Sequence, residues 1–149
     1  MVVVYSNNEP IQLEALGVPV NVIAVSEVTN LISNGIITNE QTVQQNPALV
    51  RAMTEAFDES LRYTLDNPDE AFTIAAKYVE GLNDPAIAPT QKEVLMRTLD
   101  IWYSDTLGYA EPFAWEDTRD LLLQMGLLGT PINIEAAYTN QFVPAATGQ

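Results

Sequence analysis

The sequence predicts an α/β protein in which a few N-terminal strands are followed by a predominantly α-helical part. Apolar, β-branched runs lie within the first 38 residues, and such runs are typical of strands in a covered sheet. From residue 39 onward the apolar residues recur at helical spacing. Strand, helix and strand in succession indicate an α/β unit with a parallel pair.

The first 38 residues contain three expected strands and one expected helix. Residues 2–5, 20–25 and 31–38 favour extended backbone because they are rich in Val and Ile. Between the first two runs, residues 11–16 fit a short helix that Gly17 ends. Asn34-Gly35 interrupts the third run and suggests a tight turn or a bend in the chain.

The remaining residues carry clear helix-start signals. Thr38 and Gln41 have the spacing of a capping box for a short helix. Asn46-Pro47 and Asn67-Pro68 each provide an N-cap and a proline at the first helical position, ahead of an apolar stripe. Three later helices are expected: one opened by Thr90 with Glu93 as a capping box, one containing Trp115 and closed by Gly126, and a short one after Asn133.

The composition restricts the classes of function. Twenty Asp and Glu face six Lys and Arg, which gives a formal charge of −14. Such a surface repels a nucleic-acid backbone and an anionic membrane, so we expect no nucleic-acid partner. The chain has no Cys and no His, the residues that most often provide metal ligands, general bases and activated nucleophiles. We therefore expect no metal, no cofactor and no catalytic residues.

Several segments together resemble a known family. They are "VVVYSNNEPIQLEALGVPVNVIAVSEVTNLISNGIITNE", "NPALVRAMTEAFDESLRYTLDNPDEAF", "WEDTRDLLLQMGLL" and "INIEAAYTNQF". From about residue 2 to residue 144, the chain resembles the C-terminal half of bacterial ABC-importer substrate-binding proteins. The branch is the pyrimidine-precursor-synthesis-like one, whose members bind thiamine-pyrimidine precursors, riboflavin and sulfonates.

The resemblance implies the C-terminal portion of a bilobal type II periplasmic binding protein fold. Residues 1–38 would be a strand, helix and strand remnant of the second lobe with the hinge crossing, and residues 39–144 would complete the first lobe. Residues 145–149 would form a loose tail. The N-terminal part of such a receptor has no counterpart in this sequence, so we expect the helices to expose apolar stripes that a complete fold covers.

The family's cleft-lining positions correspond here to Tyr5, Asn7, Asn8 and Glu9. Amides offer a donor and an acceptor together, and Glu9 can accept from ring N–H or hydroxyl groups. Tyr5 can stack on a flat heterocycle. The alternative is that Asn8, or the serine before the two amides, caps the helix that follows and that Glu9 complements its dipole. The two roles are compatible, because a helix start that faces a cleft serves both.

Asn34 is a further ligand-binding candidate if the chain crosses near the hinge, although a plain turn explains it more simply. Three aromatic residues on or near helices favour a core over an aromatic box, namely Trp102, Tyr103 and Trp115. Carboxylates at helical spacing, such as Glu55 with Glu59 and Asp117 with Asp120, favour solvated helix faces over a metal site.

The leading hypothesis is therefore the solute-binding component of an ABC importer, or a fragment of it, located outside the cytoplasm. It would close around a small heterocycle and dock on the permease subunits. A pyrimidine-precursor synthase-like enzyme is the first alternative, but that branch depends on an active-site His, which this chain lacks. A helical interaction module that pairs with another chain or a second copy through its free strand and bare helix faces is the second alternative.

Overall fold

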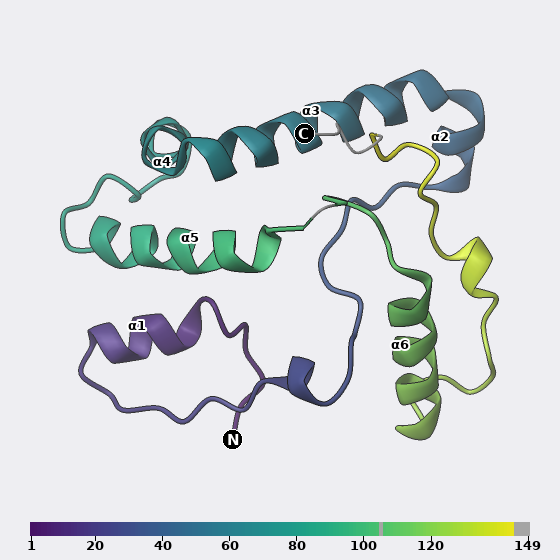
Figure 1. Ribbon diagram of the computed structural model, residues 1–149, viewed down its shortest axis with the longest axis horizontal. Coiled ribbons are helices and arrows are strands. Elements are labelled where there is room, and N and C mark those ends of the chain that lie inside the picture. The colour runs from purple at the N-terminus through teal and green to yellow at the C-terminus, as the bar shows by residue number, and fades with distance from the viewer. Residues whose placement is uncertain (105, 145–149) are drawn as a thin grey trace. The chain divides into compact units, whose positions relative to one another are not determined.

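The computed structural model describes residues 1–104 and 106–144 (Figure 1). The predicted tail, residues 145–149, lies outside them. The elements are α1 (Glu9–Ala15), η1 (Val25–Glu27), α2 (Glu40–Gln45), α3 (Pro47–Asp66), α4 (Pro68–Ala75), α5 (Ala88–Trp102), α6 (Pro112–Gln124) and η2 (Ile134–Ala136), the two η elements being single 3₁₀ turns. The predicted helical second part is confirmed.

The predicted N-terminal strands are wrong for the part of the chain that the structure describes. Residues 2–5, 20–24 and 31–38 contain no strand, and Val25 opens η1. A strand exists only where its N–H and C=O groups pair with a neighbouring strand, and these segments form no such ladder with one another. The N–H of Ile32, for example, donates to Oγ1 of Thr118 instead (3.0 Å). The apolar pattern identified segments that favour extended backbone, but it could not provide their partners.

Most helix boundaries follow the local signals. Gly17, just after α1, has a φ of 75°, which only glycine adopts readily. The two Asn-Pro pairs open α3 and α4 as predicted, with Pro47 and Pro68 as the first helical residues. The cap of α2 was assigned one residue too early, because the side chain of Asn39 accepts the N–H of Thr42 (2.8 Å).

Two later boundaries differ from the prediction. Helix α5 begins at Ala88, before the predicted capping box at Thr90, with Pro89 in its first turn. Proline fits there because its missing N–H has no intrahelical partner in any case. The short helix predicted after Asn133 is the single turn η2, and the side chain of Asn133 accepts the N–H of Glu135 (3.1 Å).

The chain divides into two compact units. Unit 1 comprises Met1–Ile23 and Glu59–Asp105, and unit 2 comprises Ala24–Asp58 and Thr106–Gln149. These units are not the predicted lobes, whose bounds stay a prediction. Because the units divide the sequence in this interleaved way, each combines segments that lie far apart along the chain.

Unit 1 is built around α5, which packs against both α1 and α4 (Figure 1). Leu99 of α5 and Ala76, just after α4, are buried. Lys92 of α5 forms an ion pair with Asp69 of α4 at 2.6 Å. At the junction of α3 with α4, a hydrogen bond to the Glu70 carboxylate raises the pKa of the Tyr63 phenol above its ordinary value. Helix–helix packing thus organises this unit.

Unit 2 is held by contacts between single side chains and irregular segments. The amide of Asn140 donates to the carbonyl of Ala110 and accepts its N–H, both at 2.9 Å. Trp115 of α6 stacks on Tyr138 with ring centroids 4.8 Å apart. The guanidinium of Arg51 lies 5.6 Å from the ring centroid of Phe142, which is buried.

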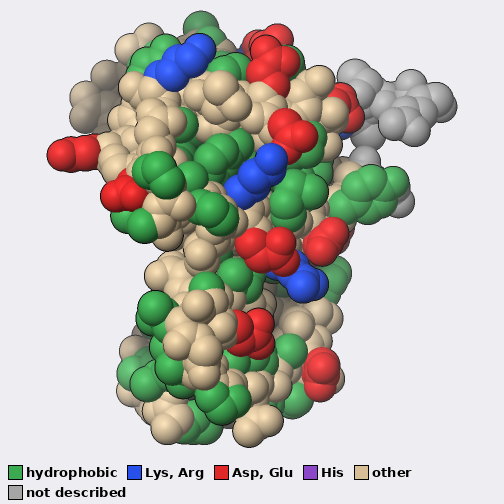
Figure 2. Space-filling model, turned by 90° about the vertical axis from the view of Figure 1, so that its left-hand side faces the viewer, with side chains coloured by type: hydrophobic (Ala, Val, Ile, Leu, Met, Phe, Trp, Pro, Cys, Tyr) green, Lys and Arg blue, Asp and Glu red, His purple; other side chains and the backbone are tan. Residues whose placement is uncertain are grey.

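Many large apolar side chains are exposed, as expected for helices with uncovered stripes. On α3, Leu49, Met53 and Phe57 are 52%, 58% and 52% exposed. Figure 2 shows apolar side chains open at the surface of one face, among acidic and basic groups. Tyr103 is 80% exposed, so its predicted place in a core is wrong. Within the described residues, none of the helices has the length and apolar character needed to span a bilayer.

Candidate functional site

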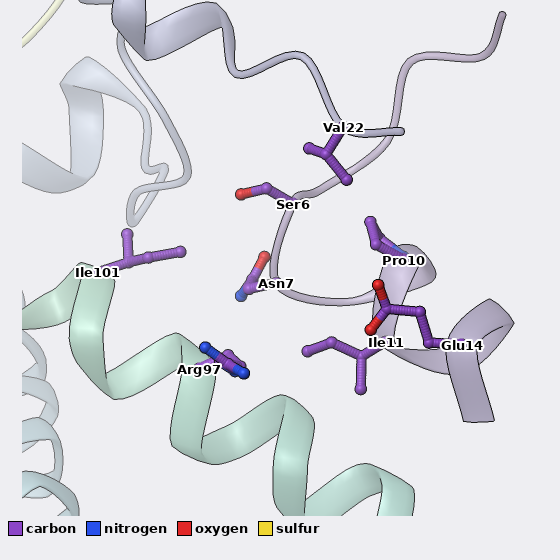
Figure 3. Close-up of a pocket in the computed structure, with 8 residues that line it drawn as sticks. All are labelled: Ser6, Asn7, Pro10, Ile11, Glu14, Val22, Arg97 and Ile101. Carbon is purple, nitrogen blue, oxygen red and sulfur yellow. The ribbon is translucent and has the colours of Figure 1, made fainter. Parts of the chain in front are cut away.

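Unit 1 contains a pocket of about 320 Å³ between the N-terminal turn, α1 and α5 (Figure 3). Its polar lining consists of Ser6 and Asn7 from the turn, Glu14 from α1 and Arg97 from α5. The volume lies at the lower end of the range that small-molecule pockets occupy. The pocket therefore suits a small solute or one part of a larger one.

The rest of the lining is apolar. It comes from Pro10, Ile11, Val22 and Ile101. Pro10 is buried and Ile11 is half-buried, so these two form the packed side of the pocket, whereas Val22 and Ile101 are exposed. In the view of Figure 3, Ile11 lies between Arg97 and Glu14. An apolar surface flanked by polar groups suits a flat ring with a polar edge.

Interactions between residues close in sequence form the N-terminal turn and α1. The N–H of Asn8 donates to the carbonyl of Tyr5 at 3.1 Å, which closes the turn before the helix. Pro10 lies in the first turn of α1, where its fixed φ favours helix initiation. Ile11 and Glu14 are three residues apart on α1 and therefore share a face. This face presents both residues to the pocket.

Two hydrogen bonds to residues of α5 hold polar side chains that line the pocket. The amide nitrogen of Asn7 donates to Oγ1 of Thr98 at 2.8 Å and ties the turn to α5. Nε of Arg97 donates to Oε1 of Glu93 one turn earlier, at 3.0 Å. Asn7 uses only its amide nitrogen in the bond to Thr98, so its carbonyl oxygen remains available to a solute. Arg97 uses only Nε, so its two terminal nitrogens also remain available.

Among the residues predicted to bind ligand, Asn7 lines this pocket and its neighbours make other contacts. The side chain of Asn8 accepts from Nε2 of Gln12 at 2.6 Å, and Glu9 accepts the N–H of Tyr5 at 3.1 Å. Asn8 does occupy the N-cap position of α1, but its side chain makes no capping hydrogen bond. A ligand-binding role for these residues stays a prediction.

Asn34, the fifth predicted residue, belongs to unit 2. It lies in the irregular segment between η1 and α2. The structure thus gathers only part of the predicted set at one pocket, and it adds residues that were not predicted.

Sequence reasoning missed Glu14 and Arg97. Glu14 had a usable signal, because it follows Ile11 by three residues on the predicted helix. Arg97 had none, since it reaches the pocket only through the packing of α5 on α1. Within the described residues, no cluster of three acidic side chains is arranged to hold a metal ion. The pocket offers hydrogen-bond donors, acceptors and apolar surface.

Two comparisons place the chain among known proteins. Residues 1–71 match the NMT1/THI5 like family. The chain is 37% identical over 150 residues to the riboflavin-binding protein RibY of Chloroflexus aurantiacus, an alignment that covers 96% of this chain and 42% of RibY. The chain thus spans about two fifths of the length of this curated relative. No solved structure matches it. Both matches support membership of the NMT1/THI5 like family for this chain.

Proposed function

We propose that the chain is the solute-binding component, or a part of it, of an ABC importer for a small heterocycle such as riboflavin or a thiamine pyrimidine precursor. The observation that carries the proposal is the similarity to a riboflavin-binding protein along 96% of this chain. The pocket of unit 1 supports it, because a polar turn, an acidic group and a basic group surround apolar surface there.

In this proposal the chain binds its solute by hydrogen bonds and apolar contact, without covalent chemistry. The absence of His and Cys supports binding over catalysis, since those residues most often provide general bases and nucleophiles. The loaded protein would work outside the cytoplasm and deliver the solute to the permease subunits of the importer. Binding would shift the protein to a closed form that the permease recognises.

The exposed stripe on α3 supports a further partner surface. Leu49, Met53 and Phe57 recur at helical spacing and are each more than half exposed. Contiguous apolar surface of this kind favours association with other protein. The chain would self-associate through this stripe. Light scattering before and after ligand is added measures this association.

The test is a titration of the full chain with riboflavin, the thiamine pyrimidine precursor and an alkanesulfonate. Calorimetry measures the binding of each solute, and the quenching of its fluorescence measures the binding of riboflavin a second way. Binding of one heterocycle with a defined stoichiometry is expected. Silence across the three solutes would contradict the proposed ligand class. A monodisperse monomer at all concentrations would contradict self-association.

A pair of amide variants tests whether the pocket takes part. Asn7→Ala is expected to weaken binding about tenfold, since it removes one hydrogen-bonding group from the lining. Asn83→Ala is the matched control, because its amide nitrogen also makes one hydrogen bond within unit 1, to the carbonyl of Ala76 at 2.7 Å. Equal affinities of the two variants would remove the pocket from the proposal.

A further inference from the structure

Several polar atoms that line the pocket make no hydrogen bond within the described residues and can therefore bind a solute. The Oδ1 atom of Asn7 is an acceptor, and the two terminal nitrogens of Arg97 are donors. The Glu14 carboxylate and the Ser6 hydroxyl make no hydrogen bond with another residue that the structure describes. A solute that offers both an N–H and a carbonyl along one edge complements this set.

The charges of the pocket disfavour an anionic solute. Arg97 and Glu14 provide one cation and one anion, on the facing helices α5 and α1 (Figure 3). An anionic solute would meet Glu14 and the net charge of −14 of the whole chain, whereas the charge of Arg97 is already paired with Glu93 at 3.0 Å. A neutral solute can use both side chains as hydrogen-bonding partners without placing like charges together.

We infer that this pocket recognises the cyclic imide edge of a neutral, flat heterocycle, with Glu14 accepting the ring N–H and Arg97 donating to the adjacent carbonyl oxygen. A cyclic imide has an N–H between two carbonyl groups, so acceptors and a donor alternate along one edge. The Ser6 hydroxyl is a donor for the second carbonyl. The apolar side chains of Ile11 and Ile101 contact the ring. The inference rests on the proposed function and narrows its ligand class.

The experiment compares riboflavin, whose ring system carries an imide N–H, with N3-methylriboflavin, in which a methyl group replaces that hydrogen. The full wild-type chain is titrated with each by calorimetry. Riboflavin is expected to bind about tenfold to a hundredfold more tightly, since the analogue cannot donate to a charged acceptor and leaves that acceptor unpaired.

Two variants separate the roles of the charged residues. Glu14→Ala is expected to bind riboflavin more weakly and to lose the discrimination between the two flavins, because the acceptor of the N–H is gone. Arg97→Gln is expected to weaken both flavins about equally and to keep the discrimination. Both residues are exposed, so the variants should fold, which circular dichroism checks.

The control is Glu80→Ala, which removes an exposed carboxylate of unit 1 that does not line the pocket. It should bind both flavins as the wild type does. Equal wild-type affinities for the two flavins, or unchanged discrimination in Glu14→Ala, would overturn the inference and leave solute binding intact. Binding of the pyrimidine precursor without riboflavin would overturn it too. Failure of every solute to bind the wild type would overturn the proposed function as well.

Discussion

The two compact units are stabilised in different ways. In unit 1, α5 packs against both α1 and α4, and its residue Leu99 is buried. In unit 2, single side chains hold irregular segments, as Asn140 holds the backbone of Ala110. The part of α3 that belongs to unit 2 exposes its apolar residues to solvent. Both units bury apolar side chains, Ala76 and Leu99 in unit 1 and Leu107 and Phe142 in unit 2. The units therefore differ in what is packed: helix against helix in unit 1, and single side chains against irregular segments in unit 2.

The largest effect is expected from Leu99→Ala. Leu99 is 9% exposed, and truncating a leucine buried among helices costs about 2–3 kcal/mol of folding free energy. Leu49→Ala, the matched control in unit 2, removes a side chain that is 52% exposed and should cost less than about 1 kcal/mol. Urea denaturation of both variants provides the comparison.

The two tryptophans allow the units to be followed separately, because Trp102 lies in unit 1 and Trp115 in unit 2. Single-tryptophan versions made with Trp115→Phe or Trp102→Phe each report one unit by fluorescence. Leu99→Ala should lower the midpoint that Trp102 reports more than the midpoint that Trp115 reports. Equal shifts of the two midpoints would show that the units unfold together and would break the comparison.

An intermediate effect is expected from Asn140→Ala in unit 2. The change removes both hydrogen bonds to the Ala110 backbone and leaves a partly buried N–H and carbonyl without their partner, at a cost of about 1–2 kcal/mol. The midpoint reported by Trp115 should fall. Asn30→Ala, at an exposed amide of the same unit, is the control and should leave it unchanged. A similar result for both would mean that polar contacts do not hold this unit.

The same contrast explains which elements were predictable from the sequence. The ends of α1, α3 and α4 depend on residues adjacent in sequence, such as Gly17 and the prolines of the Asn-Pro pairs, so local signals were sufficient. The strands failed because a ladder depends on a partner segment, which periodicity does not contain. The start of α5 was misplaced because the capping-box spacing of Thr90 and Glu93 was taken as its first turn, whereas the helix begins at Ala88 and contains Pro89 in its first turn.

The residues of the candidate site also differ in whether the sequence could predict them. Asn7 was predictable, because the family's cleft-lining positions fall in the turn that carries it. Arg97 was not, since it lies on a helix ninety residues further on and reaches the pocket only through tertiary packing. The amide-rich turn therefore indicated where a solute could bind, and the packing of α1 on α5 determined which charged groups accompany it.

The smallest effect is expected from Lys92→Gln in unit 1. The Lys92–Asp69 pair joins α5 to α4 at 2.6 Å, but the two side chains are 47% and 81% exposed. Exposed pairs contribute little because water and salt screen them, so the loss should be below about 0.5 kcal/mol and should vanish in about 1 M salt. Lys77→Gln removes the same charge from an exposed lysine of unit 1 and serves as the control. If Lys92→Gln destabilised the chain as much as Leu99→Ala, an ion pair and not apolar burial would hold α4 against α5. In that case unit 1 would depend on polar contacts as unit 2 does.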